Sequence, residues 1–344
     1  MAEKNSITFE FLMGDLANKI YHPVYLLHGE EPYFIDAVSD YIEGNVLSET
    51  EREFNQTIVY GRDTDIATLT GYARRYPMMA NYQVLIVKEA QDLNRIEELQ
   101  SYVEKPLPST ILVLCHKYGK LDERKGLARA IKQSGIIFES ARLYDNKVPD
   151  WIGSYLRQRG HAITPKAAAL LTEFLGADLG KIANELEKLL INLPAGARVD
   201  EDSIERNIGI SKDYNVFELQ KALALKDSQK AYRIVFHFAA NPKENPLPKV
   251  IPMLYSFFSK VMTYHFLADK SQNAVAAELS IRPFFVNDYQ QAARNFPPAR
   301  TARVISLLRE YDLKAKGVDN LSAGDGELMK ELVFKILQPV YPTR

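Results

Sequence analysis

Over the first 142 residues, short apolar runs alternate with segments in which apolar residues recur every three or four positions. The runs are typical of buried strands, and the periodic segments between them predict amphipathic helices. Because neighbouring parallel strands need a helix to return the chain, this alternation predicts an α/β domain with a parallel sheet. The predicted strands are 24–27, 57–60, 83–87, 111–115 and 136–138, and the predicted helices are 7–20, a helix that begins at Pro32, 65–75, 96–103 and 125–133.

From residue 143 onward the periodicity is helical, and prolines and glycines divide it into separate helices. Asn215 and Glu218 have the spacing of a capping box, in which the first side chain accepts from the first turn and the second reaches back. We therefore expect three domains. They are an α/β domain over 1–142, a small helical domain over 143–210 and an all-helical domain over 211–344.

The first predicted strand ends in a glycine turn that resembles a phosphate-binding loop without its phosphate ligands. Such a loop reads G-x-x-x-x-G-K-[ST], where backbone N–H groups and the lysine hold phosphates and the hydroxyl holds Mg²⁺. Gly29 occupies the first position, but Phe34, Ile35 and Asp36 replace the second glycine, the lysine and the hydroxyl. A bulky, an apolar and an anionic side chain do not bind a triphosphate. We predict a structural remnant of a nucleotide site and no cofactor.

A second notable segment, Tyr76-Pro77-Met78-Met79, follows the helix predicted at 65–75. Pro77 cannot continue that helix, so the large side chains around it are free to project from the surface. Methionine is unbranched and flexible, and it adapts to an existing groove. Two interpretations follow: an apolar anchor for a partner protein, or closure of the core where the helix meets the strand at 83–87.

Composition adds a limit on nucleic-acid binding. The hydrophobic content of 46%, the charged content of 25% and the formal net charge of −1 are those of a soluble globular protein without a general attraction to nucleic acid. One basic cluster either contacts DNA phosphates or forms a solvated face, because acidic residues interrupt it. The candidate DNA contacts are Lys117, Lys120, Arg124 and Lys125.

Catalytic and metal-binding signatures are missing from the sequence. The six histidines lack the i, i+3 and i, i+4 pairs of helical metal ligands, and neither G-x-S-x-G nor H-E-x-x-H occurs. The single cysteine, Cys115, cannot form an intramolecular disulfide, which indicates the reducing cytoplasm. The first six residues do not have the pattern of a secretion signal, and no segment predicts a membrane span. We predict no catalytic residue and no metal site.

Six segments, taken in order, resemble the delta-subunit family of the bacterial DNA polymerase III clamp loader. They are residues 24–31, 76–80, 83–87, 184–188, 215–219 and 311–316, and they span all three predicted domains. The resemblance implies an AAA+-like fold in the first domain, a helical lid in the second and a helical collar in the third. It also implies a non-catalytic subunit of the polymerase holoenzyme that neither binds nor hydrolyses ATP.

In that family, an apolar segment after a helix of the first domain inserts into a groove of the sliding clamp and favours the opened ring. The resemblance places this segment at Tyr76, Pro77, Met78 and Met79, where the two methionines replace the leucine and phenylalanine of many relatives. It further implies that the collar assembles with ATPase and delta-prime-like subunits on primed DNA. Two alternatives remain open: a P-loop-like ATPase with an atypical site, and a DNA-binding repair factor.

Overall fold

The structure, a computed structural model, describes residues 7–211, 213–320 and 322–338. It divides the chain into two compact units, Met1–Tyr144 and Asp145–Arg344. The N-terminal segment considered above for a secretion signal lies outside the described residues. Separate lid and collar domains, with a boundary at residue 210, stay a prediction.

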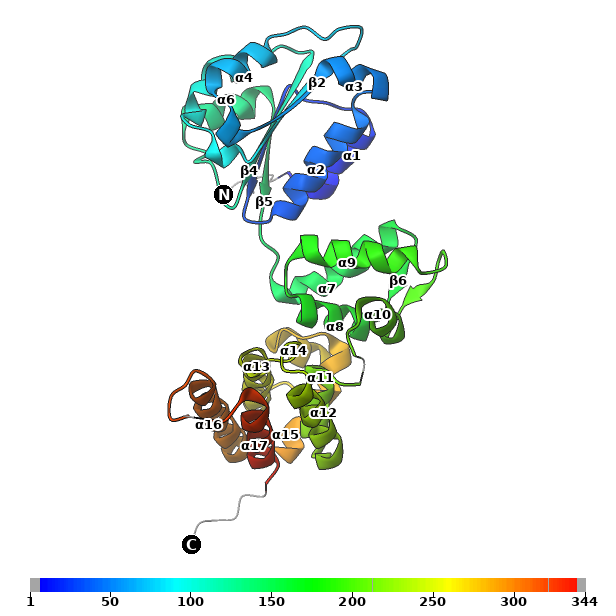
Figure 1. Cartoon of the computed structure of the whole chain (residues 1–344), viewed down its shortest axis with the longest axis vertical. Helices are drawn as coiled ribbons and strands as arrows, with labels where there is room; N and C mark the ends of the chain where they lie inside the picture. The colour runs from blue at the N-terminus through cyan, green and yellow to red at the C-terminus, as the bar shows by residue number, and fades with distance from the viewer. Residues whose placement is uncertain (1–6, 212, 321, 339–344) are drawn as a thin grey trace. The chain divides into compact units, whose positions relative to one another are not determined.

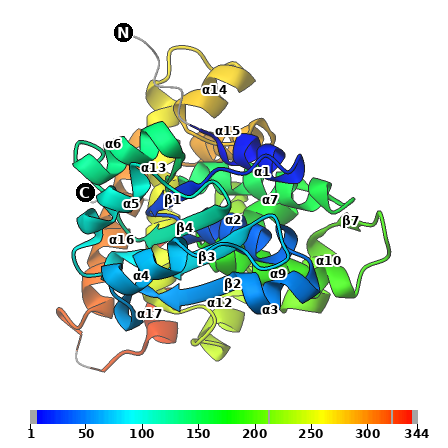
Figure 2. The same cartoon turned by 90° about the horizontal axis from the view of Figure 1, so that it is seen from above.

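The first unit is a five-stranded parallel sheet with helices on both faces (Figure 1). The strand order is β2-β3-β4-β1-β5, and Figure 2 shows β2, β3, β4 and β1 side by side from above. The strands are β1 (Val24–Gly29), β2 (Gln56–Tyr60), β3 (Gln83–Lys88), β4 (Thr110–Lys117) and β5 (Ile136–Ser140). The helices are α1 (Phe9–Ala17), α2 (Pro32–Asn45), α3 (Glu49–Asn55), α4 (Ile66–Ala73), α5 (Gln100–Val103) and α6 (Gly126–Ser134), with 3₁₀ turns η1 (Gly61–Asp63), η2 (Ala90–Asp92) and η3 (Ile96–Leu99).

Side chains alternate between the two faces of the sheet, and each face is covered by its own helices. Leu26 and Leu114 are opposite each other in the β1–β4 register, and both belong to the cluster that includes residues of α4, α5 and α6. Leu27 and Cys115, one residue further along, belong to the cluster formed with α1 and α2. The continuous apolar strands are therefore buried on both sides, which confirms the predicted fold class.

The structure of this unit differs from the local predictions in three places. Helix α1 ends at Ala17, so Ile20 is 49% exposed and does not continue the apolar face. The helix predicted at 96–103 begins as the 3₁₀ turn η3. Helix α3 was not predicted, although Ser48 and Glu51 form a capping box at its start.

The second unit is helical apart from one short parallel pair of strands, β6 with β7, which was not predicted. Its strands are β6 (Ala162–Ile163) and β7 (Arg198–Val199), and its 3₁₀ turns are η4 (Asp145–Lys147) and η5 (Pro283–Phe285). Its helices are α7 (Val148–Gln158), α8 (Pro165–Leu175), α9 (Leu179–Ile191), α10 (Glu201–Ile208), α11 (Val216–Leu225), α12 (Ser228–Ala240), α13 (Leu247–Phe266), α14 (Gln272–Glu278), α15 (Val286–Asn295), α16 (Pro298–Ala315) and α17 (Asp325–Leu337).

Polar contacts join the helices of 145–210 to those that follow, which helps to explain why they form one unit. The three pairs are Lys166–Glu218 (3.1 Å), Arg282–Asp150 (2.6 Å), and the Lys249 ammonium with the Phe174 carbonyl (3.3 Å). Asn215 accepts from the N–H of Glu218, as the capping box predicted. The buried Glu218 carboxylate also pairs with Lys166 and Lys230.

Glu173 on α8 is a carboxyl group without a hydrogen-bond partner among the described residues. Both of its oxygens are buried, and the group lines a small cavity of about 40 Å³ together with Lys249 of α13. Burial raises the pKa of Glu173 to about 8, against the opposing charge of Lys249. The folded chain therefore holds this carboxyl group in its neutral form at mildly acidic pH.

Glu173 is expected to make the second unit less stable as pH rises. Its pKa is near 4.3 in the unfolded chain and about 8 in the folded chain, so its contribution to stability is complete below pH 4.3 and is lost progressively up to pH 8. At 1.36 kcal/mol per pH unit, the loss is on the order of 3–5 kcal/mol. Glu173→Gln should remove this slope and be more stable than the wild type at pH 8.

Urea unfolding at pH 5 and at pH 8 measures this effect, with the exposed Glu278→Gln as the matched control. The control should keep the pH dependence of the wild type. Equal slopes for wild type and Glu173→Gln would show that the carboxyl group is hydrated in solution.

Candidate functional site

The turn after β1 is closed by the protein itself. A Cβ at Gly29 would lie 2.0 Å from the carbonyl oxygen of Ser140, so the glycine is required by the close approach of β5. The Gly29 carbonyl accepts from the N–H of Gly119 (3.2 Å), and the N–H of Glu31 donates to the Ser140 carbonyl (3.2 Å). Helix α2 begins at Pro32, which has no N–H. In this turn the N–H groups of Glu31 and Tyr33 thus already have acceptors within the chain, and Pro32 has no N–H to offer a phosphate.

The side chains at the three altered P-loop positions have structural contacts. Ile35 is fully buried, and Phe34 packs at 4.8 Å between ring centroids against Phe9 of α1. Asp36 pairs with Lys117 at 2.8 Å, and Glu89 approaches the same ammonium to 3.0 Å. The carboxyl end of β4 therefore has a lysine held between two carboxylates.

The pKa of Lys117 reflects this pairing. Burial alone would lower it, but hydrogen bonds and charge from Asp36 and Glu89 raise it above its usual value. A second lysine, Lys88 at the end of β3, pairs with Asp40 (2.9 Å) and Glu43 (3.4 Å) of α2. Positions 36, 40 and 43 share one helix face, so α2 offers a row of acids to this edge of the sheet.

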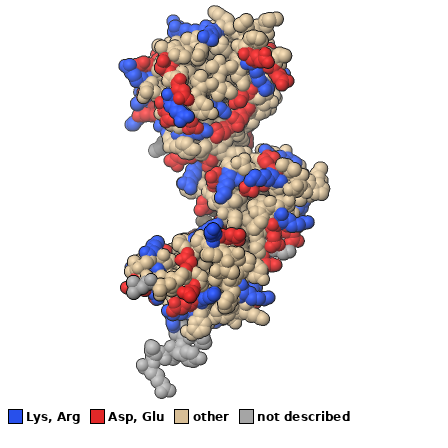
Figure 3. Space-filling model, in the orientation of Figure 1, with Lys and Arg blue, Asp and Glu red and all other residues tan. Residues whose placement is uncertain are grey.

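The candidate DNA contacts are all engaged in ion pairs. Lys117 is only 11% exposed in its side chain, and the other cations of the cluster are also matched by acids. These pairs are Lys120–Glu139 (2.6 Å), Arg124–Asp122 (3.0 Å), Lys125–Glu97 (2.6 Å) and Lys132–Glu123 (2.7 Å). Figure 3 shows basic and acidic side chains interspersed over the visible face of this unit. The pairing reduces the local field available to DNA phosphates.

The Tyr76–Met79 segment lies at the opposite edge of the sheet, between the end of α4 and the start of β3. Tyr76 is 76% exposed, Met78 63% and Met79 100%. The alternative in which these side chains close the core is therefore wrong. Met79 has a positive φ of 54°, a conformation that is uncommon for a residue with a side chain.

Buried side chains hold the start of this segment by satisfying the last carbonyls of α4. The Ala73 carbonyl accepts from the Tyr102 hydroxyl (3.1 Å) and the Thr110 hydroxyl (2.9 Å). The Tyr72 carbonyl accepts from the Gln83 amide (2.6 Å). These bonds replace the intrahelical partners that a helix end lacks.

Asn55, the last residue of α3, holds the other end of the segment. Its side chain is buried, accepts from the N–H of Met78 (2.6 Å) and donates to the carbonyl of Met78 (3.0 Å). The same amide also donates to the Glu51 carbonyl (3.0 Å). The backbone of Met78 is thus fixed from both sides, while its side chain stays exposed.

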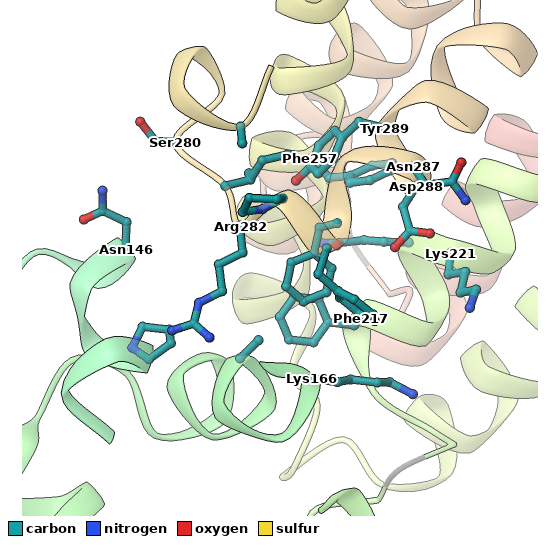
Figure 4. A pocket seen from close by; sticks show the side chains of 18 of the residues that line it. Asn146, Lys166, Phe217, Lys221, Phe257, Ser280, Arg282, Asn287, Asp288 and Tyr289 are labelled. Carbon is teal, nitrogen blue, oxygen red and sulfur yellow. The ribbon is translucent and has the colours of Figure 1, made fainter. Parts of the chain in front are cut away.

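The second unit contains a separate cavity of about 760 Å³ (Figure 4). Phe217 of α11 stacks on Phe285 with ring centroids 6.0 Å apart, and Arg282 reaches toward the start of α7, where it pairs with Asp150. Burial raises the pKa of Asp288, against the charge of Lys221. The ion pair and the aromatic stacking indicate that the cavity lies where helices of the second unit pack against one another.

The ranges that the structure describes contain neither a cluster of metal ligands nor a membrane-spanning helix. Across 7–211, 213–320 and 322–338, no three His, Cys, Asp or Glu side chains gather as metal ligands would. In the same ranges, no helix has both the length and the hydropathy to cross a bilayer.

The strand order and the helices on both faces of the sheet define the first unit as an AAA+-like α/β domain. Residues 25–141 match the family model "DNA polymerase III, delta subunit", and residues 213–333 match "DNA polymerase III delta subunit, C-terminal domain". These two ranges make up more than half of the chain. The chain belongs to the delta-subunit family of DNA polymerase III, which confirms the resemblance found in the sequence.

Individual relatives are distant but are matched over most of their length. DNA polymerase III subunit delta of Bacillus subtilis is 24% identical over 307 residues, which cover 86% of this chain and 88% of that protein. The probable delta subunit of Aquifex aeolicus is 20% identical over 275 residues, 75% of each chain. The solved structure of the B. subtilis DNA clamp loader delta protein (YqeN) has a TM-score of 0.52 at 22% identity, covering 96% of this chain and 99% of that one. This structural match supports the fold.

Asn55, which holds the exposed segment from 23 positions away, was not predicted as a site residue. The available signal was the Ser48–Glu51 capping box, since it predicts that a helix begins shortly before Asn55. The pairing of Asn55 with Met78 depends on the tertiary fold and has no local signature.

Asn55→Ala is expected to release the exposed segment. The substitution removes three hydrogen bonds and leaves the buried groups around Met78 unsatisfied, which should reduce the free energy of unfolding by about 2–3 kcal/mol. Hydrogen exchange at the Met78 amide should lose its protection. Asn81→Ala, an exposed asparagine of the same connection, should change stability by less than about 0.5 kcal/mol. Unchanged exchange at Met78 in Asn55→Ala would contradict the pairing.

Proposed function

We propose that this protein is the delta subunit of a clamp loader, which binds the sliding clamp through Tyr76, Pro77, Met78 and Met79 and favours the opened ring. The observation that carries the proposal is the exposure of three large apolar side chains on a fixed backbone. Large exposed apolar groups of this kind mark protein-binding surfaces. The family membership supplies the class of partner.

A preference for the open ring requires a difference in affinity. The anchor shifts the clamp toward the open form only by as much as it binds that form more tightly. A rigid anchor backbone suits this task, because the segment then fits one shape of the groove better than another.

The chain is proposed to work without nucleotide of its own. The Gly29 turn is closed by Ser140 and Gly119, and Asp36 is committed to Lys117. ATP hydrolysis would come from the other subunits of the loader, and the change that frees the anchor would reach this chain through them.

The second unit is proposed to supply the lid, over 143–210, and the collar, over 211–344, which assembles with the ATPase and delta-prime-like subunits. Primed DNA would be bound within that assembly, in the cytoplasm. The paired state of Lys117, Lys120, Arg124 and Lys125 makes an independent DNA-binding repair factor the weaker candidate.

The double variant Met78→Ala/Met79→Ala should bind the clamp more weakly by about 1–4 kcal/mol, since it removes the two most adaptable anchors. Surface plasmon resonance with the clamp of the same organism measures this change. Asp36→Asn is the control, because it alters the former nucleotide edge, and it should leave the affinity unchanged. Wild-type affinity in the double variant would refute the assignment of the anchor.

Equilibrium dialysis with labelled ATP tests the absence of a nucleotide site. The isolated chain should show no saturable binding at micromolar ATP, because Ile35 stands at the lysine position of the P-loop and Lys117 is paired with Asp36 and Glu89. Stoichiometric binding would favour the P-loop-like ATPase.

A further inference from the structure

Helix α3, which is hydrogen-bonded to the Tyr76–Met79 segment through Asn55, carries another large exposed apolar side chain. Phe54 directly precedes Asn55 and is 69% exposed, although the rest of this short helix is polar. Asn55 bonds directly to the backbone of Met78, and consecutive Cα atoms are about 3.8 Å apart. The Cα atoms of Phe54 and Met78 therefore lie roughly 10 Å apart, within the reach of two large side chains.

The area of the segment alone is small for a specific interface. Even if each methionine buried as much as an aromatic side chain, about 150–250 Å², Tyr76, Met78 and Met79 would together offer roughly 450–750 Å². A stable protein–protein interface buries about 800 Å² on each partner. The surface next to the segment must therefore contribute. The backbone of Phe54 is held close to Met78, because the adjacent Asn55 is hydrogen-bonded to the Met78 backbone.

We infer that Phe54 is a second anchor in the same interface and that its occupant is the sliding clamp. This inference rests on the proposed function, because the partner is assigned by continuity with the Tyr76–Met79 segment. Asn55 is the positioning residue that holds the two apolar elements in one arrangement. Aromatic residues and methionine are enriched in such contact surfaces, and aromatic residues often dominate their energy.

The chain provides a matched control for this idea. Tyr118 is 71% exposed and follows β4, whereas Asn55 precedes β2. Since all the strands are parallel, the two aromatic side chains lie at opposite edges of the sheet. Tyr118→Ala therefore removes a similar exposed ring from a surface outside the inferred interface.

The experiment measures binding of the full chain to purified clamp of the same organism by surface plasmon resonance, with circular dichroism to confirm folding. Phe54→Ala should raise Kd by about 10- to 100-fold, mainly through faster dissociation, and Tyr118→Ala should change it less than twofold. Phe54→Leu, which keeps an apolar side chain, should lie between Phe54→Ala and the wild type.

The outcomes separate this inference from the proposed function. If Phe54→Ala behaves like Tyr118→Ala while Met78→Ala/Met79→Ala loses binding, the inference fails and the proposed function stands. If the wild type does not bind the clamp, or if the double methionine variant keeps full affinity, the proposed function fails. If Phe54→Ala instead abolishes a dimer seen in sedimentation velocity, with clamp affinity unchanged, the occupant is a second copy and the inference is overturned.

Discussion

The common direction of the five strands governs the layout of the first unit. In a parallel sheet, every connection from a strand to a helix leaves at one edge, and every connection back to a strand arrives at the other. The Gly29 turn and Lys117 therefore lie at the carboxyl edge, while the Tyr76–Met79 segment, which leads into β3, lies at the amino edge. Change at one edge need not disturb the other. The closed Gly29 turn and an exposed apolar segment can therefore coexist in one small domain.

At the carboxyl edge, the charges compensate one another. A phosphate-binding loop keeps free N–H groups and a lysine for its ligand, and without a ligand a half-buried charge needs another partner. Lys117 is such a charge, and Asp36 and Glu89 supply the partners from two different elements. Asp36, which would repel a triphosphate, is thus an attractive group in this fold. The aspartate at position 36 thus argues against nucleotide binding and, through its pair with Lys117, stabilises the carboxyl edge of the sheet.

Local patterns predicted most of the fold because strands and helices follow periods that can be read along the chain. All five strands of the large sheet and most helices of the first unit were placed within a few residues, and Pro77 located the break that exposes Met78. Predictions failed where tertiary contacts decide. The Glu218 carboxylate also pairs with Lys166 and Lys230, which its spacing from Asn215 does not predict. Asn55 has no pattern that would reveal its bonds to Met78, because its partner comes from a different connection of the sheet.

The combination of a fixed backbone and free side chains suits the Tyr76–Met79 segment to the role proposed for it, binding a partner protein. Ordering one backbone residue costs about 1–2 kcal/mol of conformational entropy. Asn55 fixes the backbone of Met78, and Tyr102 and Thr110 fix the carbonyl of Ala73. Much of this entropy is therefore lost when the chain folds and not when it binds a partner. Binding then has to order chiefly the methionine side chains, at up to about 2 kcal/mol each. Methionine retains the ability to adapt its shape, whereas the preorganised backbone limits the entropy lost in the complex. The two methionines thus provide adaptable contacts on a rigid support.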